Sequence, residues 1–101
     1  MNEVDPDAVA TAVLACPHVA SLSAGTVQEI ATYLPGRRVH GIRAQDDSLE
    51  IHVVARWGTP LPEIGAEVRR AVGGLAGGRP ITVAIEDVEM PATMVSGDDG
   101  S

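Results

Sequence analysis

Three histidines are the side chains of this sequence best suited to metal chemistry: His18, His40 and His52. None of them forms a His-x-x-His or His-Glu-x-x-His pair, so a metal site would need distant residues to converge. His40 and His52 could meet across a predicted hairpin, but the simpler interpretation is that both face solvent from strands. We therefore predict no metal site and no bound cofactor.

Signals for covalent catalysis are equally weak. Cys16 is the single cysteine and has no activating neighbour in the sequence, and no serine lies in a Gly-x-Ser-x-Gly turn. The glycine-rich stretch 73–78 follows a predicted helix, whereas a phosphate-binding loop precedes one. We predict no catalytic residues and a protein that is not an enzyme.

Arginines are the remaining local signal, because Arg37, Arg38 and Arg43 lie within seven residues and Arg56 follows on a neighbouring predicted strand. This Arg-rich hairpin could contact the acidic end of a second copy. The alternative is an ordinary solvated strand edge. All seven basic residues are Arg and the formal charge is −7, which argues against a nucleic-acid partner.

The positions of these residues depend on a small set of predicted elements. Asp5 followed by Pro6 and Asp7 is typical of a helix start, and Pro17 ends that helix. Residues 18–36 are less clear: Val19 and Leu22 fit a strand or a loop. Thr26 with Glu29 forms a capping box that predicts a short helix.

A hairpin follows, with strands at 38–44 and 49–55 around the polar loop 45–48 and a bulge at Gly41. A second helix is predicted to be capped by Thr59 or, since proline restricts the preceding residue, more favourably by Leu61. Its apolar face comprises Leu61, Ile64, Val68, Ala71, Val72 and Leu75.

A third strand begins at Ile81 and ends at Glu86–Asp87. Residues 91–101 lack apolar periodicity, which predicts a disordered acidic tail after one domain at 1–90.

These elements predict an α+β fold of order α-β-β-α-β, in which a small, mostly antiparallel three-stranded sheet carries two helices on one face. The core must be aliphatic, because Tyr33 and Trp57 are the only aromatic residues. No apolar run is long enough to span a membrane, and the first residues are acidic where a signal peptide is basic. We therefore expect a cytoplasmic protein that does not insert into the membrane directly.

Trp57 occupies the corner between the second strand of the hairpin and the second helix. Gly58 permits a sharp turn, and Pro60 and Pro62 fix the start of the helix. We expect the ring to cover the end of the aliphatic core. The alternative is an exposed contact with a partner, and so we count Trp57 with the four arginines as a candidate partner contact.

Three stretches of the chain resemble the alkaline shock protein family of envelope stress response proteins, in the form found in actinobacteria. They are 33-YLPGRRVHGIR-43, 49-LEIHVVARWGTPLPEIGAEVRRAV-72 and 81-ITVAIEDV-88. In that family a strand ends in an aromatic-Gly pair, and a turn containing proline leads into an amphipathic helix. Here the sequence Gly-Gly-Arg-Pro at 77–80 replaces a shorter turn, and the glycine-rich stretch around Gly25 is shorter.

The resemblance implies a non-enzymatic cytoplasmic protein that self-associates and is held at the inner face of the cell membrane by a small membrane-anchored partner. We therefore expect an interaction or scaffold protein of cell-envelope stress response or homeostasis. The alternative is a small RNA-binding module of KH-like architecture, although the sequence lacks the Gly-x-x-Gly loop that such modules carry between two helices.

Overall fold

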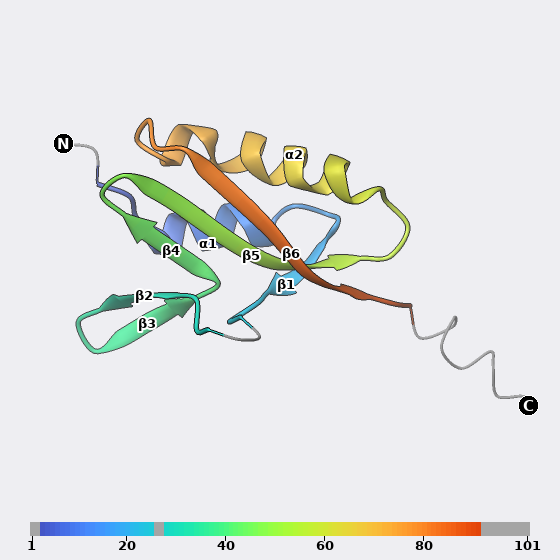
Figure 1. Ribbon diagram of the computed structural model, residues 1–101, viewed down its shortest axis with the longest axis horizontal. Helices are drawn as coiled ribbons and strands as arrows, with labels where there is room; N and C mark the ends of the chain where they lie inside the picture. The colour runs from blue at the N-terminus through green and yellow to red at the C-terminus, as the bar shows by residue number, and fades with distance from the viewer. Residues whose placement is uncertain (1–2, 26–27, 92–101) are drawn as a thin grey trace, which may run out of the picture.

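The computed structural model describes residues 3–25 and 28–91 of the chain. This part contains two α-helices, six strands and a short 3-10 turn (Figure 1). The elements, in chain order, are α1 (Pro6–Leu14), β1 (Val19–Leu22), β2 (Ala31–Leu34), β3 (Arg37–His40), β4 (Ile42–Gln45), β5 (Ser48–Arg56), α2 (Leu61–Val72), the 3-10 turn η1 (Gly73–Leu75) and β6 (Ile81–Glu89).

Strand β5 is the centre of the main sheet because it pairs with three other strands. β6 lies parallel to it from Leu49 to Arg56. The other edge is shared end to end by β4 and β1, both antiparallel to β5. The junction between them lies at His52, whose N–H donates to the carbonyl of Gly41 and whose carbonyl accepts from the N–H of Ser23.

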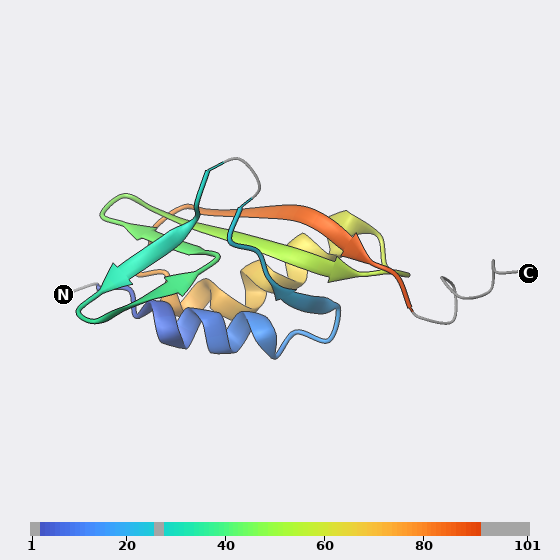
Figure 2. The same ribbon diagram turned by 90° about the horizontal axis from the view of Figure 1, so that it is seen from below.

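The predicted α+β class, with two helices on one face of a mostly antiparallel sheet, is confirmed (Figure 2). The strand count differs from the expected three: the main sheet has four strands, and β2 and β3 form a separate two-stranded sheet. β6 pairs in parallel because the connection through α2 returns the chain to the end where β5 began, as in a βαβ unit.

The core is aliphatic, as the composition predicts. Leu49, Ile51, Val53 and Ala55 alternate along β5 and are fully buried. They pack against helix residues that are four positions apart, which are Val9 and Val13 of α1 and Ile64, Val68 and Val72 of α2. Three other residues of the predicted apolar face, Leu61, Ala71 and Leu75, are exposed instead.

The helix starts are close to those predicted. The Oδ1 atom of Asp5 accepts from the N–H of Asp7 at 3.0 Å, which confirms Asp5 as the N-cap of α1. Helix α2 begins at Leu61 with Pro60 as its N-cap, so neither Thr59 nor Leu61 is the cap. The fixed φ of Pro60 suits this position, and no side chain caps the helix.

The segment before the hairpin differs from its prediction. Gln28–Ile30 are not helical, and Thr26 and Val27 lie outside the described residues. The following residues form β2, which pairs with β3, because a ladder to a neighbouring strand outweighs one local capping box. The predicted strand 38–44 is likewise two strands. Of the expected tail, residues 92–101 lie outside the described residues.

Gly41 explains the break between β3 and β4. Its φ of +83° is a conformation that side chains rarely adopt. Its N–H donates to the carbonyl of Ile30 at 2.8 Å while its carbonyl accepts from His52 at 2.9 Å. The residue therefore ties the hairpin β2–β3 to the main sheet. None of the helices in the described part is long and apolar enough to cross a membrane.

Replacing Gly41 should destabilise the fold markedly. A Cβ atom there would lie 2.8 Å from the Cβ of Leu22, in addition to the strained φ, so Gly41→Ala should cost about 2–4 kcal/mol in urea unfolding. Gly36→Ala is the matched control, since Gly36 has a φ of +78° but no described atom lies within 4 Å of the position that its Cβ would take. It should cost about 1 kcal/mol; equal losses for the two variants would contradict the packing argument.

Candidate interaction surface

Three of the five candidate contacts predicted from the sequence are engaged within the chain. Arg37 forms a two-point ion pair with Asp7 of α1. Arg38 pairs with Glu29 at 2.7 Å. Arg43 lies 3.4 Å from Glu50 and also donates to the carbonyl of Glu29.

The pair of Arg37 with Asp7 attaches the hairpin β2–β3 to α1, whereas the pair of Arg43 with Glu50 joins β4 to β5 within the main sheet. The hydrogen bonds from Arg37 lower the pKa of the Asp7 carboxyl, and the same pair raises the pKa of Arg37. For Glu29, a hydrogen bond from Tyr33 and then the charge of Arg38 lower the carboxyl pKa. All four groups of the pairs formed by Arg37 and Arg38 are exposed, so each of these two pairs contributes little to stability. The Arg-rich hairpin is therefore a set of internally paired charges.

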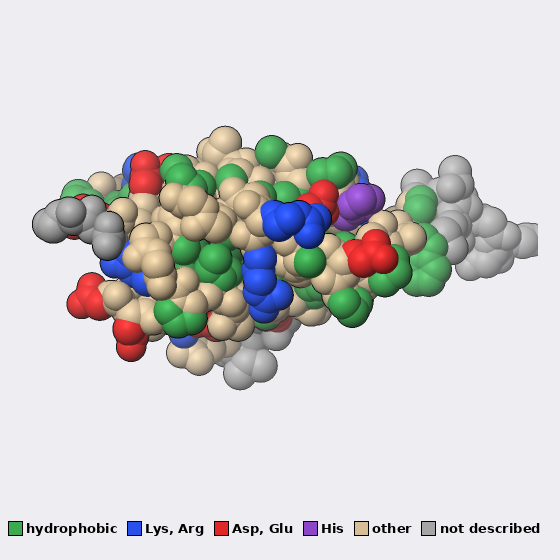
Figure 3. Space-filling view, turned by 90° about the horizontal axis from the view of Figure 1, so that it is seen from above, with side chains coloured by type: hydrophobic (Ala, Val, Ile, Leu, Met, Phe, Trp, Pro, Cys, Tyr) green, Lys and Arg blue, Asp and Glu red, His purple; other side chains and the backbone are tan. Residues whose placement is uncertain are grey.

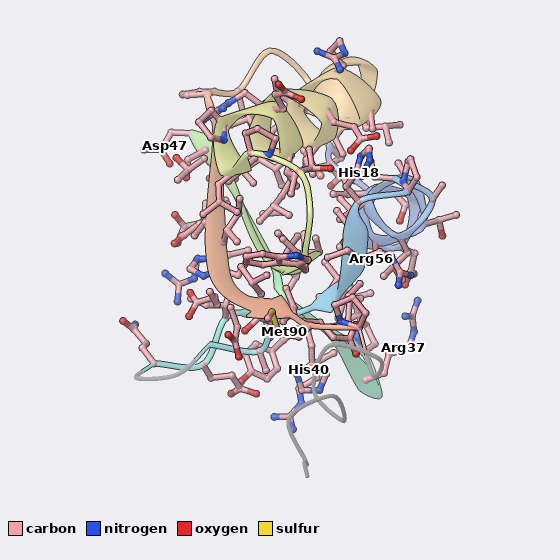
Figure 4. The ribbon with its side chains drawn as sticks, turned by 90° about the vertical axis from the view of Figure 1, so that its right-hand side faces the viewer. His18, Arg37, His40, Asp47, Arg56 and Met90 are labelled. Carbon is pink, nitrogen blue, oxygen red and sulfur yellow. The ribbon has the colours of Figure 1, made fainter. Side chains whose placement is uncertain are left out.

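Arg56 and Trp57 differ from the other three candidates. Both lie at the end of β5, where the chain turns into α2, and no side-chain partner of Arg56 is present in the described part. The backbone N–H of Trp57 donates to the carbonyl of Glu89 at 3.0 Å, which joins this corner to the end of β6. Met90 follows Glu89, the residue that pairs with Arg56, and so it lies at the same end of the sheet; Figure 4 labels both Arg56 and Met90.

The side chain of Trp57 points largely into solvent. It is 53% exposed, and it is not among the residues that pack on the core. The expectation that the ring covers the end of the core is therefore wrong. Small aliphatic side chains, Ala55 and Val88, already close that end of the sheet.

Two further exposed apolar side chains surround Trp57: Leu61 at 44% and Met90 at 41%. We call Arg56, Trp57, Leu61, Glu89 and Met90 the Trp57 corner. Figure 3 shows hydrophobic side chains gathered at this end of the molecule.

The Trp57 corner contains two open hollows. The larger, of about 580 Å³, lies between Trp57, Leu61 and Val88 and is bounded by Pro60. The second, of about 350 Å³, lies between Trp57, Glu89 and Met90. Arg56 borders both. Exposed apolar side chains grouped around a hollow, with charges at the rim, are typical of a protein-binding surface.

Sequence reasoning missed three members of the corner. Leu61 has the helical spacing of the buried face, but it is the first residue of α2. The first residue of that face to be buried in the core is Ile64, one turn later. Glu89 ends β6 and Met90 follows it, whereas the predicted end of this strand is Glu86–Asp87. A bulge in β6, where Ile85 pairs with Val53 and Asp87 with Val54, lets pairing continue to Glu89.

His52 forms the one polar cluster that is largely buried in the described part. Its Nδ1 lies 2.5 Å from Glu86 and its Nε2 lies 2.8 Å from Glu50. The two carboxylates contact opposite ring nitrogens, so they do not converge on one point. Among the described residues no group of His, Cys, Asp or Glu is arranged to hold a metal ion.

The remaining reactive side chains are placed away from the corner. His40 is exposed on β3, within the separate hairpin, and so it does not meet His52. His18 contacts Glu67 of α2 at 3.2 Å (Figure 4). Cys16 is buried just after the end of α1. Its desolvation is the main cause that raises the pKa of the thiol, and the charge of Glu67 raises it further. A raised pKa makes the thiol less nucleophilic at neutral pH.

Comparisons with protein-family models, with curated proteins and with solved structures found no match for this chain.

The ion pair between Arg37 and Asp7 should make stability depend on pH. Because the pKa of Asp7 is lowered in the folded state, the pair stabilises the fold above the ordinary pKa of an aspartate, about 4. This stabilisation is lost as the pH falls through the lowered value. Arg37→Gln should therefore reduce the unfolding free energy slightly at pH 7 and have progressively less effect below about pH 4. Arg70→Gln serves as control, and a deficit of Arg37→Gln that is undiminished in acid would contradict the pair.

Replacing His52 should destabilise the fold, because Glu50 and Glu86 then lose this polar partner. The two ring nitrogens of His52 lie within hydrogen-bond distance of Glu50 and Glu86, whereas leucine offers neither carboxylate a polar partner. We expect His52→Leu to reduce the unfolding free energy by about 2 kcal/mol. His40→Leu, on the exposed hairpin, should change it by less than about 0.5 kcal/mol. Thermal and urea unfolding measure both; equal effects would contradict a role for the cluster.

Proposed function

We propose that this protein is a non-enzymatic interaction or scaffold protein that binds other protein chains at the Trp57 corner. The observation that carries the proposal is the exposure of Trp57, Leu61 and Met90 together around two hollows. Aromatic residues, Met and Arg are enriched at the centres of protein interfaces, and Trp and Arg supply much of the binding energy there. Three of the four arginines considered are satisfied within the chain, so Arg56 is the one that a partner would engage.

The same pairing of charges speaks against the RNA-binding alternative. Phosphate contacts need exposed cations that are free to release counterions, while Arg37, Arg38 and Arg43 each have a carboxylate partner. The formal charge of −7 acts in the same direction. Protein is therefore the partner that the surface fits better.

The resemblance to the alkaline shock protein family supplies the cellular setting of the proposal. In that setting the protein acts in the cytoplasm in envelope stress response or homeostasis, associates with its own copies, and is held at the membrane by an anchored protein. A protein anchor is the more favourable means of attachment, because the net negative charge opposes direct contact with an anionic lipid surface.

The proposal predicts that the corner determines which proteins bind. Quantitative co-purification from the native cells should recover a membrane-anchored protein with the wild-type chain. Trp57→Ala and Leu61→Ala should each reduce its recovery at least tenfold, by roughly 1.4 kcal/mol or more.

Leu75→Ala is the matched control for Leu61→Ala. Leu75 is also an exposed leucine, but it lies past the far end of α2, about 20 Å away along the helix axis. Its substitution should leave recovery unchanged. Unchanged recovery with the two corner variants would place binding elsewhere and contradict the proposal.

A further inference from the structure

Arg56 and Glu89 form an unusual pair of neighbours within the Trp57 corner. They occupy paired positions on the parallel strands β5 and β6, and both are exposed. Both border the same hollow, together with Trp57 and Met90. Within the described part, neither side chain forms an ion pair, with the other or with a third residue.

This arrangement makes the corner self-complementary. In a dimer with two-fold symmetry the two copies contribute the same surface patch. Each contact between unlike groups therefore requires that one patch contain both groups, for example a cation and an anion. Among the described residues, the corner carries an unpaired cation and an unpaired anion beside the apolar side chains of Trp57, Leu61 and Met90. A rotation by 180° can place each charge against the opposite charge of a second copy.

We propose, as an extension of the proposed function, that the chain bound at the Trp57 corner is a second copy of this chain, and that the membrane-anchored protein is recovered with the resulting dimer. The two copies are related by a two-fold axis through the corner. Trp57, Leu61 and Met90 pack against the same residues of the other copy. Arg56 of each copy pairs with Glu89 of the other.

The edge of β6 is a less suitable route to the same dimer. β6 has a strand on only one side in the described part, so its other edge is a possible site for strand addition. However, the bulge at Glu86 and the carboxylates of Asp87 and Glu89 are features that discourage pairing between edges. In the corner, by contrast, the carboxylate of Glu89 has Arg56 beside it as a complementary charge, so the corner is the stronger candidate.

The first test measures association of the full chain by analytical ultracentrifugation, from about 10 µM to about 1 mM, a range that suits an interface smaller than the standard size. We expect a reversible equilibrium between monomer and dimer. Trp57 is the only tryptophan, so its fluorescence should shift to shorter wavelength as dimer forms and the ring leaves water. A monomer at every concentration, or association without a change in emission, would overturn the inference.

The second test separates pairing between copies from pairing within one copy. Arg56→Glu makes both charges of the corner negative, and Glu89→Arg makes both positive. Each variant alone should dimerise at least tenfold more weakly than wild type, owing to like-charge repulsion. An equimolar mixture of the two variants should dimerise again, because the corners are then complementary.

Arg70→Glu is the matched control, since it makes the same charge change at another exposed arginine, on α2. It should dimerise like wild type. Recovery of the mixture also shows that both variants are folded. Failure of the mixture to recover, or wild-type association of both single variants, would overturn the proposed pairing, as would assembly beyond the dimer through this surface.

The outcome is distinguishable from failure of the proposed function. A chain that stays monomeric while Trp57→Ala still abolishes recovery of a membrane-anchored protein would refute the two-fold dimer and leave the interaction function standing. A chain that dimerises through the corner but recovers no other protein through it would support the dimer alone.

Discussion

The pairing of β5 with three strands is the interaction on which the rest of the structure depends. Its Leu49, Ile51, Val53 and Ala55 are fully buried beneath both helices, and its backbone receives β6 along one edge and β4 with β1 along the other. No other strand in the described part has both edges occupied. A shift of β5 by one residue would turn its entire buried set towards the outer face.

This central position also determines what remains for binding. On the outer face of β5, His52 and Glu50 form a polar cluster with Glu86. The residues of β5 on the face that the helices cover pack in the core. The end of the strand is different, because the chain must leave the sheet at Arg56 and reach α2 within a few residues. Gly58 and Pro60 make that turn, and the turn directs Trp57 outward. The exposed corner is therefore a consequence of how β5 ends.

Features that depend on local periodicity are predictable from the sequence, whereas those that depend on pairing are not. Alternation along 49–55 and the three-four spacing after Leu61 identify β5 and α2 correctly. The pairing partner of a strand is not encoded in its local sequence. The local pattern therefore predicts a short helix where the chain leads into β2, and it predicts an end of β6 that is too early. The five candidate contacts likewise follow from residue type alone. Their partners separate them: Arg37, Arg38 and Arg43 each have a carboxylate elsewhere in the chain, and Arg56 has none in the described part.

Salt acts on the proposed dimer in two opposing directions. Two copies with a formal charge of −7 each repel one another at long range, and this repulsion is screened beyond about 8 Å at physiological ionic strength. Screening also weakens exposed pairs such as that between Arg56 and Glu89, whereas burial of Trp57, Leu61 and Met90 does not depend on charge. Added salt should therefore first favour association, because it screens the repulsion, and at higher concentration it should remove the contribution of the charge pairs. Only the apolar contacts then hold the copies together. The charge pairs thus determine the orientation of the copies more than their affinity.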